Sequence, residues 1–243
     1  MLEKLKRSLS QFAAYRGARF TYHFATDGIF RRDHLQLLGR NSHLYQFRSV
    51  TSANRYPRIF AFLRDRLEAV PAPRLLSFGC ATGEEVFTLR EYLPHAHVKG
   101  IDINPANIAL CRKRHRDHGA SPMVAFEVGA SARDEAPGSY DAVLAMAVFQ
   151  RPQLKTDPGI ESCAGIIRFE DFERTVTELA GCVKPGGYLA LAHSAFRFAD
   201  TAAAAGFTLE LERAPGRVFF PRFDRDNRRI REEAPEQVVF RRR

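Results

Sequence analysis

The sequence predicts an α/β fold, a doubly wound and mostly parallel sheet of seven strands whose last strand runs antiparallel. Short apolar runs alternate with amphipathic runs of helical length over residues 56–243, as in sheets covered by helices on both faces. The last two apolar runs are joined without a predicted helix, so they form a hairpin that reverses the final strand. The chain has 243 residues, 45% of them apolar, which suffices for one domain with its own core.

The first half of this domain contains three helices and three strands. Pro57 begins the first helix, which two further prolines end, and Pro105 stands at the start of the third helix. In chain order, the expected elements are a helix over 57–67, a strand over 75–78, a helix over 84–93, a strand over 98–103, a helix over 106–115 and a strand over 124–128.

The second half begins with a strand over 142–147 that is apolar throughout, as expected for a strand buried on both faces. A helix over 169–183 follows, because its apolar residues recur at spacings of three and four. The remaining expected elements are a strand over 188–192, an alanine-rich helix over 200–205, and strands over 207–211 and 237–240. Residues 151–168 show no regular period, and we interpret them as a lid over the reaction centre.

A turn of small residues joins the first strand to its helix. Gly79 and Gly83 lie in the run Ser-Phe-Gly-Cys-Ala-Thr-Gly, and Asp102 closes the next strand about 20 residues later. Such a unit binds a nucleoside, because the glycines let the backbone approach the ligand and the acid reaches a ribose hydroxyl. Glu84 and Glu85 begin the helix and would repel a pyrophosphate, so a nucleoside without phosphates fits better.

Together with two later motifs, these residues resemble class I S-adenosylmethionine-dependent methyltransferases. The later motifs are Tyr-Asp-Ala-Val-Leu at residues 140–144 and Val-Lys-Pro-Gly-Gly-Tyr-Leu at residues 183–189. The resemblance covers residues 58–243 and implies a Rossmann-like fold with S-adenosylmethionine as cofactor. This cofactor has no phosphate and carries a positive sulfonium, which agrees with the charge of the turn.

The resemblance assigns cofactor contacts to residues at four strand ends. Asp102 would accept hydrogen bonds from the ribose, Ile103 would pack on the adenine, Ala130 and Ser131 would replace an acid that relatives use there, and Ala147 would line the methionine end. The turn itself contributes Ser77, Gly79, Cys80, Ala81, Thr82, Gly83 and Glu84. The chain departs from the family pattern at Ser77, usually an acid, and at Ala81, usually a glycine. Either Glu84 or Glu85 could supply the missing charge.

Methyl transfer demands little of side chains, because its rate comes mainly from aligning the acceptor, methyl and sulfur. His193, at the end of the fifth strand, is the candidate general base if the acceptor must lose a proton. Gln150 and Arg151, just after the fourth strand, are candidates for substrate contact. The four cysteines are scattered without metal-site spacing, so we expect no metal and a reducing, cytoplasmic compartment.

The net charge of +9 is concentrated in the two flanks. Residues 1–66 hold 13 Lys and Arg against 4 acids, residues 67–212 hold 14 against 19, and residues 213–243 hold 10 against 5. Residues 1–55, basic and aromatic, form an expected accessory segment that caps the substrate or mediates an interaction, beside a cofactor domain over 56–243. Basic flanks suit an anionic metabolite or a nucleic acid, or are simply solvated. No run is apolar enough for a transmembrane segment.

The leading hypothesis is therefore methyl transfer to a small or medium-sized metabolite. Nucleic-acid methylation is an alternative that rests on the basic flanks. Protein methylation is another, since Thr-Gly-Glu-Glu at 82–85 and Ala-His-Ser at 192–194 look like pieces of chemotaxis-receptor carboxyl methyltransferases, whose remaining motifs are absent. A non-catalytic module that binds the cofactor and a nicotinamide dehydrogenase also stay open. The acceptor and the oligomeric state do not follow from the sequence.

Overall fold

The computed structural model describes residues 17–18, 21–22, 25–26, 51–156, 159–214, 221–231 and 234–243. The chain divides into two compact units, residues 1–42 with 47–49, and residues 43–46 with 50–243. In the first unit the described residues are helical, and the hydroxyls of Thr21 and Thr26 each donate to a carbonyl four residues earlier. The second unit contains the sheet, and the predicted boundary at residues 55 and 56 stays a prediction.

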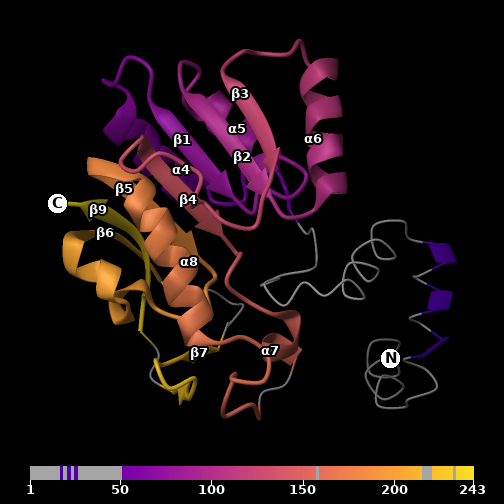
Figure 1. Ribbon diagram of the computed structural model, residues 1–243, viewed down its shortest axis with the longest axis vertical. Coiled ribbons are helices and arrows are strands. Elements are labelled where there is room, and N and C mark those ends of the chain that lie inside the picture. The colour runs from indigo at the N-terminus through magenta and orange to yellow at the C-terminus, as the bar shows by residue number, and fades with distance from the viewer. Residues whose placement is uncertain are drawn as a thin grey trace. The chain divides into compact units, whose positions relative to one another are not determined.

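The second unit is built on a seven-stranded sheet in the order β3-β2-β1-β4-β5-β9-β6 (Figure 1). The first five of these strands pair in parallel, and β9 pairs antiparallel with both β5 and β6. The doubly wound sheet and its reversed last strand are thus confirmed. The strands are β1 (Arg74–Phe78), β2 (His97–Asp102), β3 (Val124–Val128), β4 (Tyr140–Met146), β5 (Val183–Ala192), β6 (Phe207–Arg213) and β9 (Glu236–Arg242).

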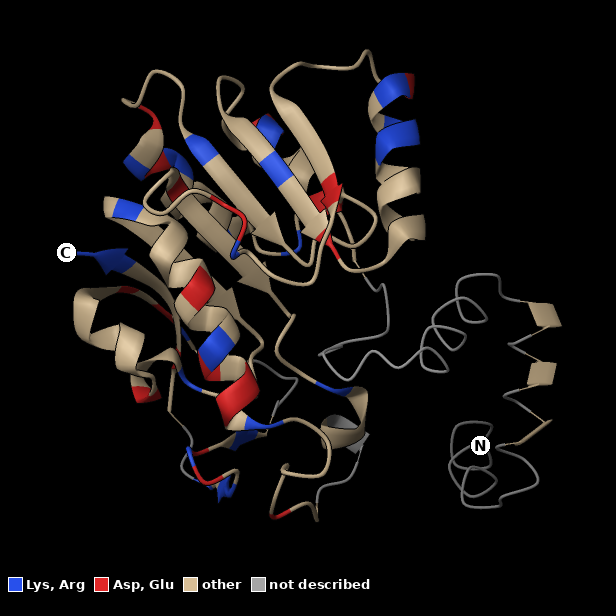
Figure 2. Cartoon of the chain, in the orientation of Figure 1, with Lys and Arg blue, Asp and Glu red and all other residues tan. Residues whose placement is uncertain are grey.

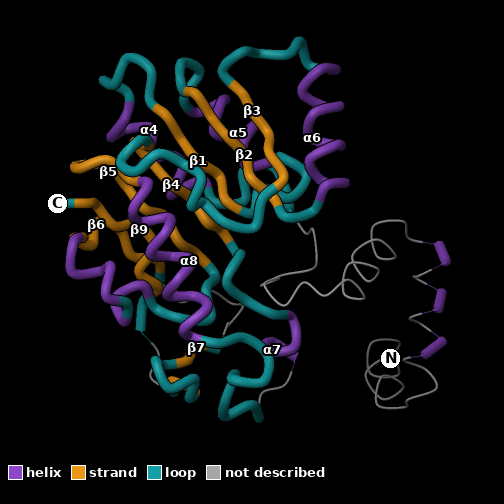
Figure 3. Tube along the Cα trace, viewed as in Figure 1, coloured by secondary structure: helices purple, strands orange, loops and turns teal. Residues whose placement is uncertain are grey.

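Helices cover both faces of the sheet, and Figure 3 draws these helices in purple and the strands in orange. One face carries α4 (Pro57–Leu67), α5 (Glu84–Tyr92) and α6 (Pro105–Asp117), which pack on alternate residues of the strands. Proline stands at the start of both α4 and α6, where its missing N–H is no loss. The Asn104 side chain caps α6 by accepting a hydrogen bond from the Ala106 N–H at 2.9 Å.

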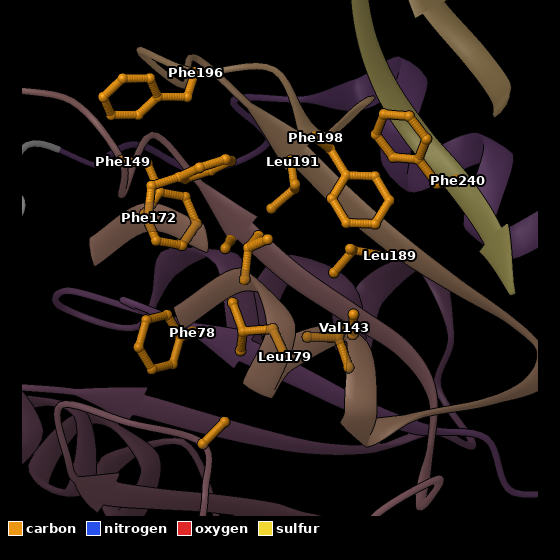
Figure 4. Close-up of a cluster of buried hydrophobic side chains, with 14 of the residues drawn as sticks. Phe78, Val143, Phe149, Phe172, Leu179, Leu189, Leu191, Phe196, Phe198 and Phe240 are labelled. Carbon is orange, nitrogen blue, oxygen red and sulfur yellow. The ribbon is translucent and has the colours of Figure 1, made fainter. Parts of the chain in front are cut away.

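The opposite face is covered by α8 (Phe169–Cys182), which packs on β4 and β5. Its apolar stripe meets the other set of alternate strand residues and forms the aromatic-rich core of Figure 4. Phe149 and Phe172 meet edge to face with their centroids 5.0 Å apart. Such a core fixes the carboxyl ends of β4 and β5, from which the later candidate site residues emerge.

Three regions differ from the predicted elements. The alanine-rich segment, predicted as one helix over 200–205, forms two short 3₁₀ helices, Phe198–Asp200 and Ala202–Gly206, that meet at Thr201. Between β6 and β9 in the chain, β7 (Arg222–Phe223) and β8 (Arg229–Ile230) pair to form a small second sheet. The irregular segment 151–168 contains the short helix α7 (Pro152–Thr156).

This irregular segment is also tied to the second sheet. Ser162 forms an isolated bridge with Arg228, and the Cys163 N–H donates to the Asn227 carbonyl at 3.0 Å. Cys163 is fully buried in the core beneath α8. Part of the predicted lid is therefore packed structure. Among the described helices, none combines the length and apolar character that crossing a bilayer requires.

Candidate active site at the carboxyl edge of the sheet

The turn after β1 brings the backbone unusually close to the exit of β4. Gly79 has a positive φ of 73°, and a Cβ at this position would lie 2.5 Å from Val148 Cγ2. The Gly79 and Cys80 N–H groups both donate to the Ile101 carbonyl, at 2.8 and 3.0 Å. Glycine is therefore required here by conformation and by space, and the turn is fixed against the end of β2.

The same turn contains a non-glycine residue in the left-handed region. Ala81 has a φ of 49°, whereas Gly83, which caps α5, has a φ of 92°. An alanine in this region carries a steric cost that a glycine would not. The position where this sequence departs from the family pattern is thus one at which the backbone conformation itself favours glycine.

Asp102 ends β2 and holds the turn through its carboxylate. Its Oδ2 accepts the Ala81 N–H at 2.9 Å, while its Oδ1 accepts the Asn104 N–H at 2.8 Å and the Asn107 side-chain amide at 3.1 Å. Burial raises the pKa of Asp102, although these hydrogen bonds oppose the shift. The side chain is 8% exposed. Oδ2 has one protein donor among the described residues, so it retains an acceptor position for a ligand hydroxyl.

A second carboxylate lies under the turn. The fully buried Ser77 donates its hydroxyl to Glu85 Oε1 at 2.7 Å. Burial raises the pKa of Glu85 to about 7, opposed by the Ser77 hydrogen bond and by the positive charge of Arg55. Within the described part of the chain, Glu85 makes no ion pair. The acid that the family pattern places at position 77 is replaced in space by one from α5.

Glu84 is placed differently from its neighbour. It forms an ion pair with Arg114 of α6 at 2.7 Å and accepts the Thr82 hydroxyl at 2.6 Å. Burial opposes its ionisation, but these hydrogen bonds outweigh that effect and lower the pKa of Glu84. Its charge is thus already neutralised within the protein. Of the two acids that the sequence offered, Glu85 is the one placed beside Ser77.

The segment after β3 lies next to the end of β2. The Gly129 N–H donates to the Asp102 carbonyl at 3.1 Å, which places Ala130 and Ser131 on the same edge. Ile103 is partly buried and Ala130 is exposed. The Ser131 hydroxyl, however, donates to Glu178 of α8 in a short hydrogen bond. Ser131 therefore already has a protein acceptor, and the backbone of this segment is its more accessible part.

The exits of β4 and β5 form the other half of this edge. Ala147 has a φ of 59° and donates its N–H to the Ala192 carbonyl at 2.7 Å. Gln150 is buried, with its side-chain amide 3.4 Å from the Ala147 carbonyl. Burial also lowers the pKa of the Arg151 guanidinium. These residues follow β4 directly and sit beside the core rather than in open solvent.

His193 lies at the end of β5 in a constrained position that the sequence does not reveal. Its φ is 53°, and its backbone N–H donates to Glu236 Oε1 at 2.5 Å. Glu236 also forms a short ion pair with Arg213. The Nδ1 atom of the ring lies 3.1 Å from the hydroxyl of Tyr56. Tyr56 and Glu236 are 137 and 43 residues away in the chain, so no local motif points to them.

A pocket of about 290 Å³ adjoins this histidine at the ends of β5, β6 and β9. Its apolar wall consists of Leu191, Phe196 and Phe198, and its polar wall includes Arg222 and Glu236. Glu236 lines this pocket and accepts the His193 backbone N–H, whereas the His193 ring contacts Tyr56 and is not part of the pocket wall. No cluster of three or more His, Cys, Asp or Glu capable of holding a metal was found in the described ranges.

Comparison with known proteins identifies part of this domain. Residues 76–189 match the family model described as a methyltransferase domain. An uncharacterized protein of a Synechococcus strain, syc1184_c, is 28% identical over 137 residues, which is 55% of this chain and 28% of that protein. The chain therefore spans less than a third of this curated relative.

Similar solved structures include the [4+2]-cyclase SpnF, at 23% identity and a TM-score of 0.40 over 55% of this chain and 43% of that one. Geranyl diphosphate C-methyltransferase from Streptomyces coelicolor, solved with S-adenosylhomocysteine, shows 18% identity and a TM-score of 0.40 over 56% and 45%. YcgJ from Bacillus subtilis shows 17% and 0.42 over 59% and 53%. The family match thus extends over the turn after β1, β2, β4 and the larger part of β5, which are the elements that build this edge of the sheet.

Proposed function

We propose that this protein binds S-adenosylmethionine at the carboxyl edge of β1, β2 and β4 and transfers its methyl group to a small acceptor. The observation that carries the proposal is the meeting of the Gly79 turn, Asp102 and Glu85 at one edge. A carboxyl edge of an open α/β sheet is where such folds bind ligands. When bound, the cofactor supplies a methyl group on a positively charged sulfur that leaves as a neutral thioether.

The ribose and adenine would be held by the β2 and β3 side of this edge. Asp102 Oδ2 has an acceptor position left for a ribose hydroxyl, and its other oxygen anchors the turn. Ile103 follows Asp102 and would contact the adenine ring. The backbone at Ala130 would contact the adenine from the next strand, with Ser131 in a supporting role because its hydroxyl is already bonded.

The methionine end of the cofactor would lie toward Glu85 and Ala147. Its ammonium group needs an anion, and Glu85 is a carboxylate without an ion pair among the described residues, whereas Glu84 is paired with Arg114. Ser77 would orient Glu85 through their hydrogen bond. The backbone of Cys80, Ala81, Thr82 and Gly83 would line this part of the turn.

The acceptor would approach from the β4 and β5 side. His193, Gln150 and Arg151 follow these two strands, and the pocket lined by Leu191, Phe196 and Glu236 on the same edge has the size of a small-molecule site. Its apolar wall would orient the acceptor, which is the main contribution a methyltransferase makes to the rate. The pocket supports a metabolite as acceptor rather than a polymer.

The placement of the C-terminal arginines also favours a small acceptor. Arg241 and Arg242 donate to the carbonyls of Gly186 and Val183, and Arg213 pairs with Glu236. These side chains are engaged by the chain itself, which reduces what is available to nucleic-acid phosphates. The four cysteines are free thiols, which supports a reducing compartment such as the cytoplasm.

Methyl-labelled S-adenosylmethionine tests the proposal. The full chain is incubated with labelled cofactor and cell extract, and the products are separated by size. We expect label in the small-molecule fraction, and Glu85→Gln to reduce it strongly. Glu127→Gln, which changes an exposed carboxylate paired with Lys99, is the matched control and should transfer normally. Label confined to protein or nucleic acid, or absent altogether, would contradict the proposal.

A further inference from the structure

The buried Tyr56 and the half-buried His193 form a pair that joins the start of α4 to the end of β5. Tyr56 is 6% exposed, and its ring centroid lies 5.5 Å from that of His193. The tyrosine hydroxyl is 3.1 Å from Nδ1 of the histidine. Because only one hydrogen lies between these two atoms, the direction of the bond decides which ring nitrogen of a neutral His193 carries its own hydrogen.

The phenol of Tyr56 must be the donor in this bond. Burial raises the pKa of Tyr56 far above its ordinary value, so the hydroxyl keeps its hydrogen at any pH of interest. Across the described ranges, Nδ1 is its one hydrogen-bond partner. If Nδ1 carried the hydrogen instead, the phenol hydrogen would be buried without an acceptor, at a cost of a lost hydrogen bond.

The surrounding charges do not reverse this assignment. Arg55 and Arg213 contribute positive charge at Tyr56, and Glu85 and Glu236 contribute negative charge, so the two signs balance in number. Glu236 is already occupied by Arg213 and by the His193 backbone N–H. The hydrogen bond from the His193 N–H to Glu236 holds the backbone at its positive φ and so fixes the position of the His193 Cβ. The hydrogen bond to Tyr56 then fixes the rotation of the imidazole ring.

We propose that Tyr56 is a positioning residue that locks His193 with its hydrogen on Nε2, which makes the histidine a hydrogen-bond donor and not a general base. This inference rests on the proposed function, in which His193 lies on the acceptor side. A reaction without a base needs an acceptor atom with a free lone pair and no proton to lose in the transition state. The acceptor should therefore be a group that is already nucleophilic at neutral pH.

Nitrogen NMR of the full chain labelled with ¹⁵N-histidine tests the inference without knowledge of the acceptor. The His193 signals are identified by their loss in His193→Gln. In the neutral ring we expect Nε2 to be protonated and Nδ1 to be an acceptor. In Tyr56→Phe the Nδ1 signal should move, because this ring nitrogen loses its hydrogen-bond donor.

The matched control is Tyr92→Phe, which removes a hydroxyl bonded to Asn54 and should leave the His193 signals unchanged. Hydrogen on Nδ1 in the wild type, or His193 signals that are the same in Tyr56→Phe, would overturn the inference. Binding of S-adenosylhomocysteine by the wild type is measured in parallel. Its absence would overturn the proposed function while the assignment of the hydrogen stands on its own.

Discussion

At the scale of single residues, side chains at the carboxyl edge of the sheet accept hydrogen bonds from backbone N–H groups and so fix the conformation of the loops there. Asp102 shows this most clearly, because its two oxygens fix Ala81, Asn104 and Asn107 before any ligand arrives. Replacing Asp102 would therefore disturb the turn as well as a ribose contact. Glu85 is the better residue for testing binding, since among the described residues its side chain accepts a hydrogen bond from the Ser77 hydroxyl alone.

The backbone strain at Ala81 leads to a stability prediction. Because Ala81 has a φ of 49°, Ala81→Gly should relieve a steric cost larger than the entropy that glycine adds to the unfolded chain. We expect stabilisation by roughly 0.5–1 kcal/mol, measured as a rise in melting temperature of about 1–3 °C.

Ala205→Gly is the matched control for this change. Ala205 is exposed and lies in a short helix without a positive φ, so glycine there should lower the melting temperature slightly. A lower melting temperature for Ala81→Gly than for the wild type would contradict this account of the turn.

At the scale of elements, the sequence predicts the parts whose signals are local. The strands of the sheet, the capped helices and the reversed last strand all follow from apolar runs, prolines and the missing helix between β6 and β9. The β7–β8 sheet could not be predicted in this way. Its two-residue strands carry no periodic pattern, and they form where the fully buried Phe223 bridges Phe196 in the segment after β5.

The candidate site divides along the same line. The turn, Asp102 and His193 lie in recognisable motifs, whereas the partners that orient them come from distant segments. The hydrogen bond between Ser77 and Glu85 can be predicted only if α5 is known to fold back over β1. The contact of Tyr56 with His193 joins residues that are 137 positions apart in the chain. Motifs thus locate the edge, and tertiary packing decides what each residue in it does.

Asn227 anchors the small sheet and supplies a prediction for this element. Its buried side-chain oxygen accepts the Phe169 N–H at 2.7 Å, at the start of α8, and its φ is 63°. Asn227→Ala leaves that N–H without an acceptor and strains the backbone, so we expect destabilisation by about 1–3 kcal/mol in urea unfolding.

Asn227→Asp separates the lost acceptor from other effects of the change. The aspartate keeps an oxygen near the amino end of α8, where a negative charge is favourable, and it tolerates a positive φ. Its stability should stay nearer to the wild type than that of Asn227→Ala. Equal stability of all three proteins would show that the anchor contributes little.

At the scale of the whole molecule, the distribution of charge means less for binding than the sequence suggests. Figure 2 shows Lys and Arg spread over the helices, strands and C-terminal strand, with acids among them. On α6, Lys113 pairs with Asp117 and Arg114 pairs with Glu84. Because so much of the basic charge is paired or bonded to backbone, the net charge alone does not indicate a polymer as partner.

The carboxyl edge of the sheet has two halves, to which we assign the cofactor and the acceptor. The β1–β2–β3 half holds the turn and Asp102, and the β4–β5–β9 half holds His193 and the pocket. Val148 joins them, since it packs directly on Gly79. A nucleoside bound on one half would therefore meet an acceptor bound on the other, which is the arrangement that in-line methyl transfer requires.

The most direct test of this account is calorimetric titration with S-adenosylhomocysteine between pH 6 and pH 7.5. Because the pKa of Glu85 is about 7 in the folded chain, the ionised carboxylate that we propose for the ligand's ammonium becomes populated over this range. Affinity should therefore tighten by roughly eightfold as the pH rises, in proportion to the ionised fraction of Glu85, while the ligand's amino-acid ammonium stays protonated.

Glu85→Gln should bind at least about tenfold more weakly at pH 7.5 and lose this pH dependence. Glu91→Gln, an exposed change at the far end of the same helix, should behave as the wild type. Wild-type protein that binds no S-adenosylhomocysteine at any pH, or binding that Glu85→Gln leaves unchanged, would contradict the placement of the cofactor at this edge.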